Sequence, residues 1–107
     1  MIDERSGIWG AALEVPGSTP DGFRSGAGAN TIWCASSGNC QAGGFVKSGS
    51  ADNAYVVTES AGHWGNLHVV AASLNTYGNA ATDEISCASY GNCVAIGFYQ
   101  YNVGPNG

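Results

Sequence analysis

Residues 32–45 read IWCASSGNCQAGGF, and residues 85–98 read ISCASYGNCVAIGF. The two stretches are related by a constant offset of 53 residues, which is the spacing between Cys34 and Cys87. A shorter match, SGIWG at 6–10 against AGHWG at 61–65, has an offset of 55 residues. A fixed period of this length is typical of repeat architectures, in which one supersecondary unit cannot bury its apolar face alone.

The cysteine-flanked segment of each copy predicts a β-hairpin. In the first copy Cys34 and Cys40 enclose ASSGN. If two antiparallel strands meet with Cys34 opposite Cys40 and Ala35 opposite Asn39, the loop is the three residues 36–38. Glycine then stands third, where a left-handed backbone is needed.

Opposed cysteines in such a hairpin have α-carbons about 5.5 Å apart, which suits a disulfide. We therefore predict the disulfides Cys34–Cys40 and Cys87–Cys93, and with them an extracellular protein, secreted or at the cell surface. The alternative is a zinc site, but zinc-binding cysteines are usually two to four residues apart and these are separated by five.

The repeated unit predicts four short strands, at 31–35, 40–46, 54–59 and from 64 to about 70, separated by turn-rich segments. No segment keeps a helical period, so we expect an all-β chain. Side chains alternate across each strand, which gives every sheet a face of small residues and a bulky face. The bulky residues are Trp33 and Phe45 in the first copy and Val94, Ile96 and Phe98 in the second. Sheets of this kind, stacked around an axis with bulky face into small face, make a β-propeller.

The motif I-x-C-A-S-x-G-N-C-x-A-x-G-F, followed by AYVVTESAGHWG at 54–65, resembles the tandem repeats of secreted bacterial proteins. Those repeats are similar to sialidase-type (Asp-box, or BNR) propeller blades. The resemblance runs from about residue 6 to residue 98 and implies four-stranded blades.

The domain organisation expected from this pattern is a single repeat domain over residues 1–107. It consists of a half blade (1–17), a complete blade (30–71) and a second half blade (83–101). Two blade equivalents cannot close a ring, which usually needs four to eight blades. Several copies could close one if the N-terminal strands of one chain completed the C-terminal hairpin of the next. A trimer is favoured, with a dimer or tetramer also possible; the alternative is a fragment of a longer repeat array.

The charge pattern excludes several functions. The net charge is −5 with three cationic residues, too few to neutralise nucleic-acid phosphates or to hold an anionic membrane surface. No apolar run is long enough to insert into a membrane. No signal peptide is visible at the N-terminus, so we expect that either the signal was removed or the sequence is an excerpt from a longer protein.

Catalysis is not expected either. Sialidase-type enzymes hold a substrate carboxylate with several arginines, and only Arg5 and Arg24 are present. Asp83 and Glu84 are adjacent and would point to opposite faces of a strand, and a hydrolase would need acid pairs assembled between chains. His63 and His68 have no cysteine or acidic cluster beside them, so no metal or other cofactor is expected.

Aromatic residues are the best candidates for a binding site: Trp33, Tyr90, Trp9, Trp64 and Tyr77. A tryptophan or tyrosine ring stacks on sugar rings or on a protein partner. Trp9 and Trp64 recur at equivalent positions, which favours a structural role for them, whereas Trp33 and Tyr90 break the repeat. We expect a lectin-like, multivalent binding module that recognises glycans or surface proteins through loop aromatics. The alternative is a structural scaffold repeat, or a piece of a larger cell-surface propeller, without a ligand of its own.

Overall fold

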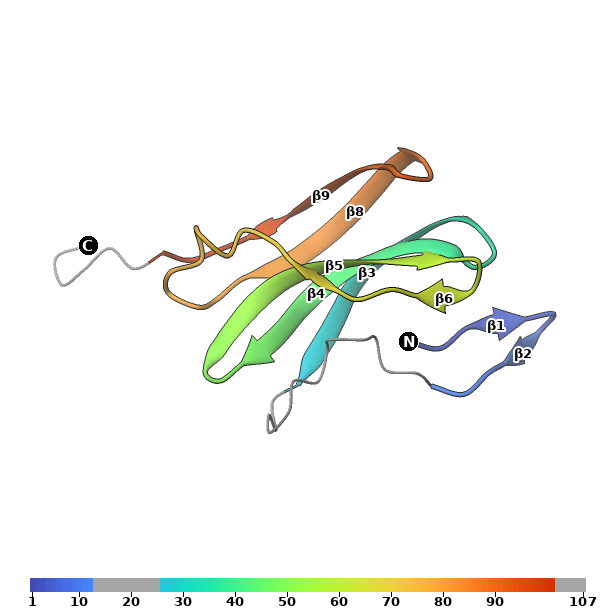
Figure 1. Ribbon diagram of the computed structural model, residues 1–107, viewed down its shortest axis with the longest axis horizontal. Coiled ribbons are helices and arrows are strands. Elements are labelled where there is room, and N and C mark those ends of the chain that lie inside the picture. The colour runs from blue at the N-terminus through green and yellow to red at the C-terminus, as the bar shows by residue number, and fades with distance from the viewer. Residues whose placement is uncertain (13–25, 102–107) are drawn as a thin grey trace, which may run out of the picture.

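The computed structural model describes residues 1–12 and 26–101, and all regular structure in these ranges is β (Figure 1). The largest sheet is an antiparallel meander of β3 (Ala27–Ser36), β4 (Asn39–Ser48) and β5 (Ala51–Ser60). Two short strands, β6 (His63–Trp64) and β7 (His68–Val69), pair in succession with the outer edge of β5. They form an interrupted fourth strand, so the expected four-strand order is confirmed.

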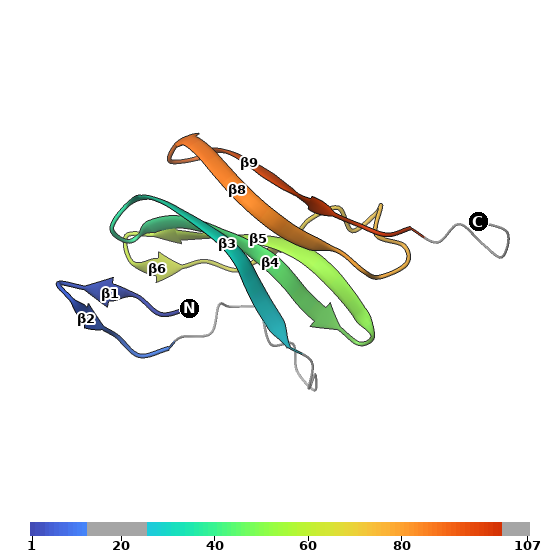
Figure 2. The same cartoon turned by 180° about the vertical axis from the view of Figure 1, so that it is seen from behind.

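Two hairpins flank this sheet. One consists of β1 (Glu4–Arg5) and β2 (Ile8–Trp9), and the other of β8 (Ala81–Ser89) and β9 (Asn92–Phe98). Figures 1 and 2 show the β8–β9 hairpin above the sheet and the β1–β2 hairpin below it. The chain is therefore all-β with several antiparallel sheets. Residues 13–17 of the expected N-terminal half blade, and Arg24, lie outside the described ranges.

Both predicted disulfides are present. The α-carbons are 4.0 Å apart for Cys34–Cys40 and 3.9 Å apart for Cys87–Cys93. This spacing is near the roughly 4.5 Å of antiparallel residues that face each other without exchanging hydrogen bonds, rather than the wider 5.5 Å pair. The cysteines of each copy stand in register, so the zinc alternative is wrong.

The hairpin register differs from the prediction by one residue. Asn39 lies opposite Ser36, so the expected pairing of Ala35 with Asn39 is wrong. A bulge between Cys34 and Ser36 takes up Ala35, and Gly38 has the left-handed conformation that was expected, with φ of 79°. The second hairpin repeats the bulge between Cys87 and Ser89.

The strands are also longer than the sequence indicated. Strand β3 begins at Ala27 rather than at residue 31, because a second bulge between Ala29 and Thr31 interrupts the alternation that marks a strand. Strand β5 begins at Ala51, inside a segment expected to be a loop. A tight turn at Gly49, with φ of 63°, allows this, and an ion pair between Lys47 and Asp52 (3.0 Å) lies across it.

The two faces of the large sheet are covered differently. The small face carries the buried cluster Ala42, Val46, Tyr55 and Val57, against which Met1, Trp64 and Leu67 pack. The bulky face is covered by β8, which lies against β3, β4 and β5. On the second hairpin Ile85, on its small face, is buried, whereas the bulky side chains Val94, Ile96 and Phe98 are exposed. The bulky face of the first sheet therefore packs against the small face of the second.

Close backbone contact and hydrogen bonds hold this stack together. Gly43 lies so near Thr82 that a Cβ on Gly43 would stand 2.7 Å from the Thr82 Cγ2. The Asn30 side chain donates to the Thr82 carbonyl (3.1 Å), and the Ile85 amide donates to the Thr31 hydroxyl (3.2 Å). These bonds lie at the bulge of β3, which turns residues 30 and 31 toward the second sheet.

We predict that Gly43→Ala destabilises the stack by about 1–3 kcal/mol, because the added methyl overpacks the contact with Thr82. Thr82→Ala in the same chain should restore part of this loss. Urea unfolding followed by tryptophan fluorescence measures both effects. Gly26→Ala is the matched control, since a Cβ there meets no atom within 4 Å. Equal stabilities of the Gly43 and Gly26 variants would contradict the packing described here.

Candidate functional site

The five predicted aromatic residues occupy different environments. Trp64 is half-buried and packs against the core cluster of the first sheet, as a structural tryptophan would. Trp9, at the equivalent position of the β1–β2 hairpin, is 61% exposed. Trp33 is half-buried on the face of β3 that the second hairpin covers. Tyr90, at the tip of the second hairpin, donates its hydroxyl to the Glu59 carbonyl at 3.4 Å and so ties the tip to β5. The structure does not gather these four side chains into one site.

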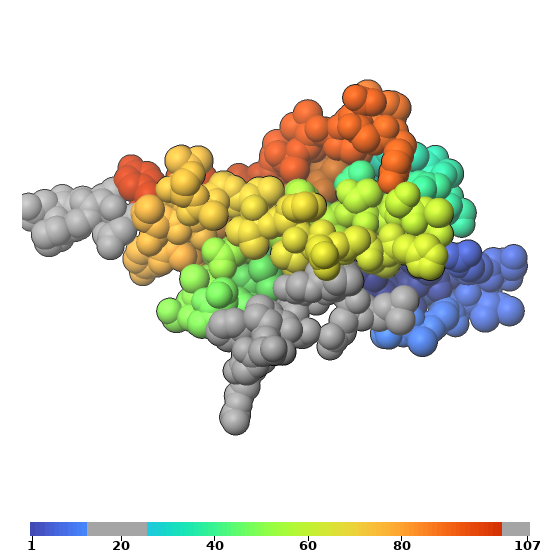
Figure 3. Space-filling model, in the orientation of Figure 1, coloured from blue at the N-terminus to red at the C-terminus, as the bar shows by residue number. Residues whose placement is uncertain are grey.

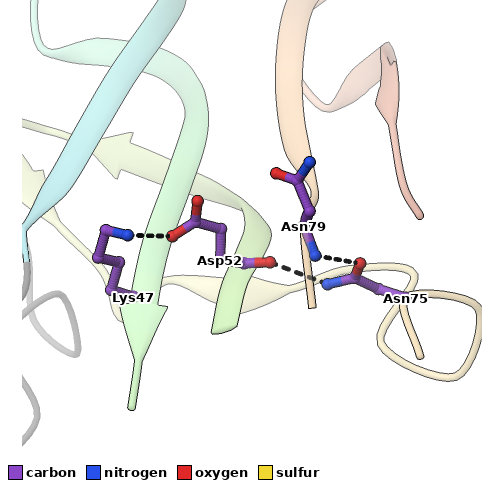
Figure 4. A network of polar contacts seen from close by, with 4 residues as sticks. All are labelled: Lys47, Asp52, Asn75 and Asn79. Atoms are coloured by element: carbon purple, nitrogen blue, oxygen red, sulfur yellow. Dashed lines mark hydrogen bonds and ion pairs between the residues drawn. The ribbon is translucent and has the colours of Figure 1, made fainter. Parts of the chain in front are cut away.

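Tyr77 is the most exposed of the five, at 63%, and it lies on a loop that polar contacts hold in place. The buried Asn75 side chain donates to the Asp52 carbonyl (2.9 Å) and accepts the Asn79 amide (2.9 Å), as Figure 4 shows. Asp52 also pairs with Lys47, so the loop is fixed to the β4–β5 turn. A rigid loop presents an aromatic ring at low cost in conformational entropy on binding.

Gln100 joins the same loop to the end of the second hairpin. Its carbonyl accepts the Tyr77 amide (3.0 Å), and its side chain accepts a hydrogen bond from the Asn79 side chain (2.9 Å). The residues on either side of it, Tyr99 and Tyr101, are exposed tyrosines. The structure thus brings Tyr77 beside a segment with two further tyrosines and exposed amides. Sequence reasoning missed Tyr99 and Tyr101 because they follow the repeat and have no counterpart in the first copy.

A second polar site was also missed: a carboxyl pair formed by Asp3, just before β1, and Glu59 of β5. Glu59 is 1% exposed, and its Oε2 has no hydrogen-bond partner among the described residues. Asp3 forms a side-chain hydrogen bond with Glu59, and the Arg5 guanidinium lies close by, over Gly62. Burial, followed by the bond with Asp3 and its negative charge, raises the pKa of Glu59 from 4.5 to about 7, while Arg5 lowers it. A carboxyl group with a raised pKa therefore lies where the N-terminal hairpin meets the first sheet.

Among residues 1–12 and 26–101 no group of three or more histidine, cysteine or acidic side chains could hold a metal ion. In the same ranges no helix is long and apolar enough to cross a membrane. Asp83 and Glu84 are both exposed on β8, where a bulge lies between Thr82 and Glu84.

No protein-family model, curated protein or solved structure matches this chain.

We predict that the carboxyl pair makes stability fall with rising pH. The folded state holds the Glu59 proton more tightly than the unfolded chain does, so this contribution is complete below pH 4.5 and is lost as the pH rises through about 7. Glu59→Gln keeps the hydrogen bond without the titration, and should be more stable than the wild type at pH 8 and similar to it at pH 5.

Urea unfolding at the two pH values measures the difference. Glu84→Gln is the matched control, because Glu84 is exposed on β8 and should keep the wild-type pH dependence. Parallel pH profiles for wild type and Glu59→Gln would show that folding does not raise the pKa of Glu59.

Proposed function

We propose that the protein is a secreted, lectin-like binding module that works as a homo-oligomer and recognises glycans through exposed loop aromatics. Its sheets are the blades of a propeller-like ring to which each chain contributes two blade equivalents, with three chains favoured. The observation that carries the binding role is the loop of Tyr77, an exposed ring on a segment held by Asn75 and Gln100.

The chemistry around Tyr77 supports a glycan rather than a charged ligand. A tyrosine ring offers a flat apolar face to a pyranose ring, and its hydroxyl and nearby amides can bond to sugar hydroxyls. The polar groups around Tyr77 are the amides of Asn79 and Gln100, which are both donors and acceptors. A ring of several copies would repeat this weak site and raise the avidity without any new contact.

The two disulfides support the extracellular location, because such bonds persist in oxidising compartments. The alternative function is a scaffold repeat without a ligand. The hydrogen bond of Tyr90 and the half-buried position of Trp33 favour this alternative for those two residues, since both contribute to the stacking of the sheets.

A glycan array of the purified protein tests the proposal. We predict binding that Tyr77→Ala weakens at least about tenfold, since truncating an aromatic anchor typically costs more than about 1.4 kcal/mol. Trp9→Ala, Trp33→Ala and Tyr90→Ala are measured in parallel, and Val69→Ala, an exposed residue on β7, is the control. Absence of binding above background, or binding indifferent to Tyr77, would favour the scaffold.

A further inference from the structure

The outer edge of β9 has no strand beside it in the part of the chain that the structure describes. In the first sheet the corresponding edge of β4 is occupied by β5, from Gln41 opposite Thr58 to Ser48 opposite Ala51. Strand β9 pairs with β8 alone. Its bulky face is also bare: Val94 is 66% exposed and Ile96 58%. An open edge beside an exposed apolar face is a template for pairing with another chain.

The β1–β2 hairpin has the same backbone conformation as the end of β5 and the start of β6, which are the strands that have no counterpart beside β9. The turn at Ser6 and Gly7 has φ angles of 52° and 79°. The turn between β5 and β6 in the first sheet has 51° at Ala61 and 84° at Gly62. The Gly10 amide donates to the Asp3 carbonyl at 2.8 Å, and the Gly65 amide donates to the Thr58 carbonyl at 2.9 Å. Residues 3–10 thus repeat the backbone of residues 58–65.

We propose that β1 of one copy pairs antiparallel with the open edge of β9 of the next copy. The partner is a second copy of this chain, and the interface gives a structural basis to the homo-oligomer of the proposed function, on which it rests. The two repeat offsets fix the register. Ala42 opposite Val57 becomes Ala95 opposite Ile2, and Gln41 opposite Thr58 becomes Val94 opposite Asp3.

A hollow along the β9 edge accepts the incoming strand. Its volume is about 430 Å³, and its lining includes Ala54, Val56, Leu74 and Ala95. Ile2 of the second copy, facing Ala95, enters this space, just as Val57 facing Ala42 is buried in the first sheet. The same Ile2 is 49% exposed in the single chain. Pairing of β1 with β9 therefore fills the hollow and at the same time buries Ile2.

The opposite face of the molecule offers the complementary surface. Beside β1, the small face of the first sheet leaves Ile32 57% exposed, over hollows of about 270 and 250 Å³ that Ile32 lines. The bulky face of the partner's β9 hairpin covers this area when β9 pairs with β1. The side-chain sizes agree with this stack. Within the chain, Gly43 of the first sheet contacts Thr82 of the second. The 53-residue offset makes the equivalent pair between copies Ile96 of one copy against Ala29 of the other. The small residue lies on the bulky face within the chain (Gly43) and on the small face between copies (Ala29), so the packed volume stays similar.

The hairpin tips supply matching hydrogen bonds. In the first sheet the Gly62 amide donates to the Gly38 carbonyl (3.0 Å), and the Ala61 amide donates to the Asn39 side chain (3.1 Å). Asn92, the counterpart of Asn39, has the same orientation, because its Nδ2 donates to the Ser89 hydroxyl at 2.9 Å. Its Oδ1 is then placed to accept the Ser6 amide of the second copy.

Val94→Asp tests the interface, with Val69→Asp as the matched control. Both valines are exposed in the single chain, so neither change should unfold it, and circular dichroism checks this. Sedimentation velocity should show oligomers for the wild type and Val69→Asp, and a shift of at least tenfold toward dissociation for Val94→Asp. A monomeric wild type, or equal assembly of the two variants, would overturn the proposal.

Cysteine trapping tests the register. In the chain carrying Ile2→Cys and Ala95→Cys, oxidation should link copies covalently, and the ladder on a non-reducing gel should end at the size of the ring. Ile2→Cys with Ile96→Cys is the control, because neighbouring strand positions point to opposite faces. Equal cross-linking in both chains, or none in the first, would exclude this register.

The glycan array separates the interface from the proposed function. If the protein cross-links between copies but binds no glycan on the array, the interface stands and the lectin role is excluded. Glycan binding by a protein that stays monomeric retains the lectin role and removes the interface.

Discussion

The contact between a bulky sheet face and a small one governs this structure. Glycine at position 43 and threonine at 82 allow the backbones of β4 and β8 to approach closely, and the buried Ile85 packs from the small side. Neither sheet could bury its apolar residues alone, since each hairpin or meander has only one layer. Figure 3 shows the consequence: the β8–β9 hairpin forms a ridge on the outside of the first sheet, with its other face toward solvent.

The stacking of bulky face on small face leaves one apolar face uncovered at each end of the molecule. The first sheet keeps part of its small face open around Ile32, and the second keeps its bulky face open around Ile96 and Phe98. An open bulky face and an open small face are complementary by the chemistry already used within the chain. Head-to-tail contacts of this kind close into rings when the rotation between copies allows it.

Much of this fold was predictable because the two copies of the repeat can be compared with each other. The internal repeat gave the cysteine pairing, the four-strand order and the two kinds of sheet face. The bulges at Ala35 and near Asn30 were not predictable, since a bulge breaks the alternation from which strands are recognised. The carboxyl pair was missed for another reason: Asp3 and Glu59 lie 56 residues apart in the sequence and meet only when the N-terminal hairpin folds onto β5. The tyrosines beside Gln100 fall outside the repeat, so periodicity says nothing of them.

In the proposed assembly, the pairing of β4 with β5 inside the chain recurs between copies as the pairing of β9 with β1. Isotope-filtered NOE spectroscopy on protein refolded from an equal mixture of labelled and unlabelled chains tests it most directly. We expect intermolecular cross-strand contacts between Ala95 and Ile2 and between Val94 and Asp3. Spectra with cross-strand contacts inside single chains only, such as Ala42 with Val57, would contradict it.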